Sequence, residues 1–275
     1  MSNCKVIALT NQKGGVGKTT TAVNLGVSLV QQSKKVLLID ADAQANLTMA
    51  LGYNRPDDIP ITLSTVMQNI IDDKTLDVSQ GIIHHSEGVD LLPSNIEMSG
   101  FEVRLINAMS RERVLKTYVN EVKKNYDYVL IDCMPSLGMI TINALAAADS
   151  VIIPTQPHYL SAKGLELLLR SVSMVKRQIN PKLRIDGILM TMVMPRTNIS
   201  KEITATVKSA YGQKIKVFDT EIPHSIRAVE ATAEGKSIFA YDKSGKVAAA
   251  YEQLGKEVAE IGEKQRNQNR ADRIR

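Results

Sequence analysis

The sequence predicts a single α/β domain in which one mostly parallel, twisted sheet carries helices on both faces. Short apolar runs rich in Val, Ile and Leu alternate with longer segments of helical periodicity. The runs are continuously apolar, as in strands that are covered on both faces. Of the 275 residues, 44% are hydrophobic and 23% charged, which is ordinary for a globular protein with a sizeable core.

Six segments read as buried strands. Each is a short run of Val, Ile and Leu, and a longer connection separates it from the next run. Such connections favour parallel pairing with helical crossovers. The expected strands are 5–10, 35–40, 89–93, 127–132, 150–155 and 185–193.

Three segments between or after these strands have clear helical periodicity. They are 17–32, 160–179 and 244–262, in which apolar residues recur every three or four positions. The polar, basic end of the chain, 263–275, is expected to be a flexible tail.

Composition limits the classes of function. The formal net charge of +5 is a mild indication of an anionic partner. Two cysteines, Cys4 and Cys133, are too few for a disulfide framework or a multi-cysteine metal site, which fits a reducing cytosol. The chain lacks signal-peptide features, and no apolar run approaches the ~18 residues of a membrane span. We therefore expect a cytoplasmic protein.

The stretch "TNQKGGVGKTTT" (10–21) joins the first strand to the first helix and resembles a phosphate-binding loop. It departs from the pattern G-x-x-x-x-G-K-[ST] because Gln12 replaces the first glycine and Lys13 precedes a glycine pair. Lys18 is expected to reach the β- and γ-phosphates, and the Thr19 hydroxyl to ligate Mg²⁺. Loop N–H groups and the helix N-terminus would hold the phosphates. The expected nucleotide-binding residues are Gly14, Gly15, Val16, Gly17, Lys18, Thr19 and Thr20.

Three aspartates follow or end buried strands. "LLIDADAQAN" (37–46) carries Asp40 and Asp42, and "YVLIDCMPSLG" (128–138) carries Asp132. Carboxylates at the C-terminal ends of parallel strands face the ligand crevice. Asp132 is expected to help bind Mg²⁺, and Asp40 or Asp42 could position the attacking water.

Together these motifs resemble the deviant Walker A ATPases of the ParA/MinD superfamily. "RTN" (196–198) and "IPHSIRAVEA" (222–231) narrow the resemblance to the ParA/Soj partition ATPases. It covers nearly the whole chain, from about residue 6 to about residue 259. It implies a deviant P-loop NTPase fold, with an ATPase domain at 1–262 and the basic tail at 263–275.

The resemblance also implies a mechanism. ATP and Mg²⁺ support a sandwich homodimer that binds double-stranded DNA without sequence preference. Slow hydrolysis of ATP to ADP and phosphate, stimulated by DNA and a ParB-like partner, releases the dimer from the DNA. The location implied is cytoplasmic, and nucleoid-associated with ATP bound.

Several residues take roles from the resemblance alone. Lys13 matches the lysine that reaches the partner's phosphates across the dimer. Asp42 matches the water-positioning carboxylate, so that Lys13, Lys18 and Asp42 are the catalytic candidates. Asp40 matches a residue near the Mg²⁺ shell, alongside Thr19 and Asp132.

Three further residues, Pro223, Arg196 and Arg227, match family positions at the adenine and on DNA. Pro223 matches a residue that lines the adenine, and both arginines match positions that contact DNA. Met134 stands where relatives usually have proline, and we expect little effect. His224 and Ser225 replace a usual Arg-Asn, which leaves one contact of the family in question. No extension precedes the first strand, so operator binding is not expected.

Other classes fit less well. A MinD-like membrane ATPase needs an apolar C-terminal face, but past Ile261 the only large apolar residue is Ile274. A nitrogenase-reductase type needs paired cluster cysteines, whereas Cys4 and Cys133 read as core residues. A bacterial tyrosine kinase would carry a tyrosine-rich tail, and no tyrosine follows Tyr251. Whether the basic tail is solvated or contacts DNA stays open.

Overall fold

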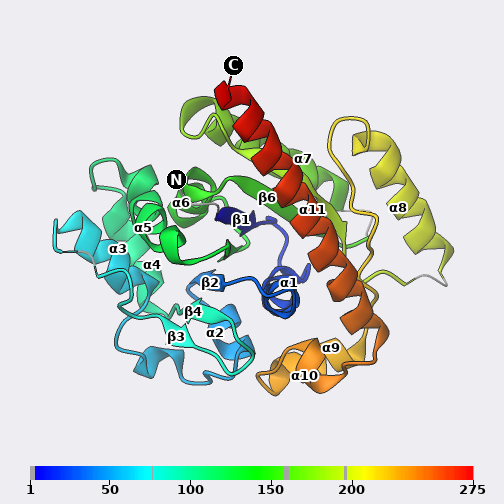
Figure 1. Ribbon diagram of the computed structural model, residues 1–275, viewed down its shortest axis with the longest axis horizontal. Coiled ribbons are helices and arrows are strands. Elements are labelled where there is room, and N and C mark those ends of the chain that lie inside the picture. The colour runs from blue at the N-terminus through cyan, green and yellow to red at the C-terminus, as the bar shows by residue number, and fades with distance from the viewer. Residues whose placement is uncertain (1–3, 76, 158–160, 195–196, 275) are drawn as a thin grey trace.

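Seven strands form one sheet in the order β3-β4-β2-β5-β1-β6-β7. The computed structural model describes residues 4–75, 77–157, 161–194 and 197–274 (Figure 1). Every neighbouring pair is parallel except β3 with β4. The strands are β1 (Lys5–Leu9), β2 (Val36–Ala41), β3 (Ile83–His84), β4 (Asp90–Leu92), β5 (Tyr128–Cys133), β6 (Ser150–Thr155) and β7 (Arg184–Met190).

Helices cover both faces of this sheet. Short 3₁₀ turns lie at Pro56–Asp58, Arg111–Arg113 and Lys123–Asn125. The α-helices are α1 (Lys18–Gln31), α2 (Asn46–Ala50), α3 (Leu63–Ile71), α4 (Glu97–Leu105), α5 (Val114–Val122), α6 (Met139–Ala147), α7 (Ser161–Gln178), α8 (Asn198–Tyr211), α9 (Ile226–Ala233), α10 (Ile238–Tyr241) and α11 (Lys246–Ile274).

Alternate side chains of each strand enter two separate cores. In β1, Val6 and Ala8 pack on the face covered by α3 to α7, while Ile7 and Leu9 pack on the face covered by α1, α10 and α11. This alternation follows from the two-residue period of a strand. Because both faces are buried, the strands are apolar throughout, which is the pattern seen in the sequence.

The predicted fold class is confirmed: the sheet is mostly parallel, helices lie on both faces, and the whole forms one domain. All six predicted strands exist. The predicted strand 185–193 was too long, because β7 ends at Met190 and Met192 takes a left-handed conformation with φ 53°. The short edge strand β3 was not predicted. The three predicted helices correspond to α1, α7 and α11, and the remaining helices were missed.

The C-terminal segment 263–274 is helical, and its expected flexibility stays a prediction. Helix α11 continues to Ile274, so the backbone of 263–274 is helical rather than an irregular tail. Beyond Gly262 the chain contains no Gly or Pro and includes four Arg, two Gln, one Glu and one Lys, which favour helix. Two side chains also anchor it: Gln265 Nε2 donates to Asp186 Oδ1 at 2.9 Å, and the Arg266 guanidinium lies 5.9 Å from the Tyr128 ring centre. Figure 1 shows α11 (red) crossing the molecule beside α1, against which it packs.

Among the described residues, none of the helices has the length and apolar character needed to cross a bilayer.

Candidate active site

The loop between β1 and α1 presents backbone N–H groups at a helix N-terminus. Gly17 is the N-cap residue of α1, with φ 80° and no capping side chain. Gly15 also has positive φ, at 68°. Both conformations are accessible to glycine at little cost, which explains the glycines of this loop. The first N–H groups of α1 therefore stay available to an anion.

Lys18 lies inside the loop. Its Nζ donates to the carbonyl oxygens of Asn11 and Lys13, each at 3.3 Å, and the residue is only 7% exposed. Burial lowers the pKa of Lys18, and the nearby carboxylates of Asp132 and Asp42 oppose this shift. The ammonium at the base of the loop is suited to phosphate oxygens. Charged phosphate oxygens would be stronger hydrogen-bond acceptors for it than the two carbonyls that it contacts here.

Asp132 provides an acceptor beside Thr19. The Thr19 hydroxyl donates to Asp132 Oδ2 at 2.6 Å. The other oxygen, Oδ1, is buried and has no hydrogen-bond partner among the described residues. Burial, and then the charge of Asp40, raise the pKa of Asp132 to about 8. A buried carboxylate oxygen without a donor is costly unless a cation or water completes it.

This arrangement fits Mg²⁺, which is usually held by one or two carboxylates, water and substrate phosphates rather than by a protein cage. The part of the chain that the structure describes contains no cluster of three His, Cys, Asp or Glu side chains arranged to hold a metal ion. Thr19 and Asp132 are the residues that would hold the ion.

Asp40 organises the turn that carries Asp42. Asp40 lies directly beside Asp132 in the β2–β5 register. Its Oδ1 accepts from the Asp42 N–H at 3.1 Å, and its Oδ2 accepts from the N–H and hydroxyl of Thr48 at 2.9 and 2.7 Å. Burial raises the pKa of Asp40 to about 7. Its visible role is thus to hold the turn, and its predicted contact near Mg²⁺ stays a proposal.

Asp42 itself lies at the start of a tight turn into α2. Its Oδ1 accepts from the Gln44 N–H at 3.0 Å, and its carbonyl accepts from the Ala45 N–H at 2.9 Å. The side chain is buried beside the phosphate loop, close enough to influence the pKa of Lys18. The structure therefore brings the three predicted aspartates together at the carboxyl ends of the strands, next to Lys18 and Thr19.

The second lysine of the loop is held only through its main chain. The Lys13 N–H donates to Asn11 Oδ1 at 3.0 Å, and the Lys13 carbonyl accepts from Lys18. Within the described residues, the Lys13 ammonium has no ion-pair partner. Lys13 is partly exposed, and its in-trans role stays a prediction.

The other predicted contacts lie further along the same end of the sheet. Pro223 pairs with Val193 just beyond β7. The Arg227 side chain, on α9, is 63% exposed, and its Nε lies 3.6 Å from Asp242 Oδ2. Arg196 lies outside the described residues.

Sequence reasoning missed four polar residues that support the loop and the aspartates. Asn11 Nδ2 donates to the Pro154 carbonyl at 2.7 Å. Gln156 and Thr191 donate to carbonyls of the loop, and Thr48 donates to Asp40. Gln156 and Thr191 directly follow β6 and β7, so the strand-end rule that identified the aspartates could have found them.

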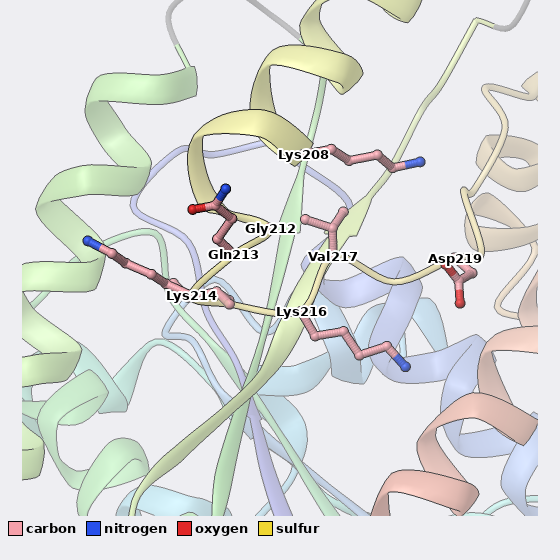
Figure 2. A pocket seen from close by; sticks show the side chains of 8 residues that line it. Lys208, Gly212, Gln213, Lys214, Lys216, Val217 and Asp219 are labelled. Carbon is pink, nitrogen blue, oxygen red and sulfur yellow. The ribbon is translucent and has the colours of Figure 1, made fainter.

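A separate hollow of about 650 Å³ lies between the end of α8 and the segment that follows it (Figure 2). Its lining includes Lys208, Lys214 and Lys216, whose ammonium groups do not converge on one point in this view. Lys208 already pairs with Glu221 at 3.1 Å, and Lys216 with Glu257 at 3.6 Å. Two of its three lysines are therefore neutralised, and no residue of the phosphate loop lines it.

Comparison with known proteins agrees with this geometry. A family model described as an AAA domain matches residues 4–185. The sporulation initiation inhibitor protein Soj of Bacillus subtilis is 44% identical over 259 residues, covering 94% of this chain and 99% of Soj. The chromosome partitioning protein ParA of Myxococcus xanthus is 38% identical over 256 residues, covering 92% and 87%. A crystal structure described as cobyrinic acid a,c-diamide synthase from Mycobacterium smegmatis, with bound ATP analogue and magnesium, superposes with a TM-score of 0.80 at 34% identity, covering 92% and 93%.

Proposed function

The chain belongs to the ParA/Soj family of P-loop partition ATPases, and from this membership we propose how it works. It binds ATP with Mg²⁺, forms a sandwich homodimer, and in that form binds double-stranded DNA without sequence preference. Hydrolysis to ADP and phosphate, stimulated by DNA and a ParB-like protein, dissolves the dimer and releases the DNA.

The observation that supports the ATPase assignment is the hydrogen bond between Thr19 and Asp132. The hydroxyl that follows the loop lysine donates to a strand-end carboxylate whose other oxygen lacks a donor among the described residues. A phosphate loop needs this pair next to its lysine in order to hold a Mg²⁺-bound nucleotide. When bound, Mg²⁺ would neutralise phosphate charge. The chain's own part is to hold the phosphates with Lys18 and the N–H groups of the loop.

Hydrolysis needs a positioned water and a charge on the transferred phosphoryl group. We assign the first role to Asp42, whose turn is fixed by Asp40. We assign the second to Lys13 of the partner subunit, because Lys13 is partly exposed and its ammonium has no ion-pair partner among the described residues. A dimer is then required for turnover, which makes dimerisation and hydrolysis parts of one cycle.

DNA binding would follow from the same dimer. Arg227 and, by resemblance, Arg196 supply phosphate contacts, and pairing two protomers doubles those contacts on one duplex. Contacts to phosphate carry no base information, so binding would be independent of sequence. We do not propose amide synthesis, the activity named for the M. smegmatis protein, because identity and coverage are both greater with Soj.

The decisive experiment measures ATP turnover alone, with DNA, and with DNA plus a ParB-like protein encoded beside this chain. Turnover that DNA and the partner raise together supports the proposal. Wild-type protein that binds no ATP, or turnover that neither addition changes, would contradict it.

Asp42→Ala tests the division of roles in the same assay. Removing the water-positioning carboxylate spares the ground-state phosphate contacts, so this variant should bind ATP and dimerise but not hydrolyse. Size-exclusion chromatography with ATP should show a persistent dimer. A variant that stays monomeric with ATP would show that Asp42 has another role.

A further inference from the structure

Two side chains that follow the neighbouring strands β6 and β7 donate hydrogen bonds to backbone carbonyls of the phosphate loop. Gln156, which follows β6, donates from Nε2 to the Gly15 carbonyl at 2.8 Å. Thr191, which follows β7 and is 1% exposed, donates from Oγ1 to the Val16 carbonyl at 2.8 Å. These contacts span 141 and 175 residues of sequence, so they are not part of the local loop motif.

The two carbonyls determine the direction of the next two N–H groups. In a trans peptide the C=O of one residue and the N–H of the following residue point in opposite directions. The structure contains no cis peptide bond among the described residues. Holding the carbonyls of Gly15 and Val16 therefore turns the N–H groups of Val16 and Gly17 to the opposite side. Among the described residues, no acceptor takes a hydrogen bond from either N–H group.

We propose that Gln156 and Thr191 are positioning residues that orient the N–H groups of Val16 and Gly17 toward the phosphates of the nucleotide. This inference rests on the proposed nucleotide binding and adds two residues to its machinery. Gly15 and Gly17 have positive φ and no side chain to lock the loop. External anchors supply that order before the ligand arrives, so less entropy is lost on binding.

The anchors also connect the loop to the segment that carries Pro223. The Thr191 N–H donates to the Thr155 carbonyl at 2.9 Å, which ties the ends of β6 and β7 together. Two residues later, the Val193 N–H donates to the Ile222 carbonyl at 2.9 Å, beside Pro223. The phosphate loop and the predicted adenine-lining residue thus lie on one hydrogen-bonded frame.

The test is calorimetric binding of Mg·ADP to monomeric protein without DNA or partner. Thr191→Val keeps the shape but removes the donor, and should weaken binding about three- to tenfold, the effect of one neutral hydrogen bond. Thr191→Ser keeps the hydroxyl and should restore binding. Gln156→Met keeps a similar length, removes the donor without adding a charge beside the phosphates, and should weaken binding similarly. In each weakened variant, the amide resonances of Val16 and Gly17 should shift in NMR spectra.

Thr204→Val is the matched control, because its buried hydroxyl has no hydrogen-bond partner among the described residues. It should bind Mg·ADP like the wild type. Wild-type protein that binds no Mg·ADP would contradict the proposed function itself. A wild type that binds, together with unchanged affinity in Thr191→Val and Gln156→Met, would overturn this inference alone. So would equal losses in Thr191→Ser or Thr204→Val, since these would indicate a general packing effect. If Thr191→Val does not fold, Gln156→Met decides.

Discussion

Replacing Arg227 tests the proposed DNA contact through its dependence on salt. Arg227 projects from the start of α9, and its side chain is 63% exposed. Its neighbour Asp242, whose side chain is 22% exposed, lies 3.6 Å away, and a pair this long with an exposed arginine contributes little to stability. The guanidinium is therefore available to a phosphate, and Arg227→Ala should not disturb the fold.

The magnitude follows from counterion release. Each neutralised phosphate contributes about −0.9 to the slope of log K against log salt, so losing one contact per protomer, or two per dimer, should make the slope shallower by about 1.8. Between about 50 and 200 mM salt, the wild type should then lose about tenfold more affinity than the variant. ATP binding should stay intact, because the Arg227 ion pair is with Asp242 and, among the described residues, its side chain makes no hydrogen bond to the phosphate loop.

The assay is a salt titration on two unrelated duplexes, with ATP and with ADP. Arg227→Lys keeps the charge and should retain the wild-type slope. Asp242→Asn removes the competing carboxylate and should bind DNA at least as tightly as the wild type. An unchanged slope in Arg227→Ala, strong binding with ADP, or a large preference for one duplex would each refute the reasoning.

Three further predictions concern the loop and the fold. Lys18→Ala should abolish ATP binding, since Lys18 supplies the buried positive charge of the loop; unchanged affinity for a fluorescent ATP analogue would contradict this. Lys13→Ala should bind ATP but lose partner-stimulated turnover by up to about 10³–10⁵-fold, the range of a cation supplied in trans, and normal turnover would exclude that role. Gly235→Ala would place a Cβ 2.3 Å from the Gly52 Cα at φ +67°, so chemical denaturation should show a loss of about 2–5 kcal/mol from backbone strain and overpacking. Its control, Gly100→Ala within α4, meets nothing within 4 Å and should be neutral or stabilising; equal effects of the two substitutions would show that the contact with Gly52 is unimportant.

The sequence was sufficient for the parallel sheet and for the placement of the aspartates, because both follow from local patterns. A continuous apolar run predicts a strand that is buried on both faces. In a parallel sheet, residues at the carboxyl ends of adjacent strands come together whatever their separation in sequence. Asp40 and Asp132 are paired in this way across β2 and β5. The short helices α2, α9 and α10 were missed because tertiary packing, rather than their own periodicity, stabilises segments of this length.

What local patterns could not predict is the backbone conformation beside the site. Of the described non-glycine residues with positive φ, Ala45 lies three residues after Asp42, and Met192 follows Thr191. An L-residue in this region is strained by about 1–2 kcal/mol, so neither conformation follows from propensity. Hydrogen bonds hold both: the Ala45 N–H donates to the Asp42 carbonyl at 2.9 Å, and Gln156 contacts the Met192 sulfur. Strain of this kind persists only where the surroundings determine the conformation. The strained residues lie in the two turns that direct Asp42 and Thr191 toward the phosphate loop. The proposed reaction needs this geometry, which would justify the energetic cost of the strain.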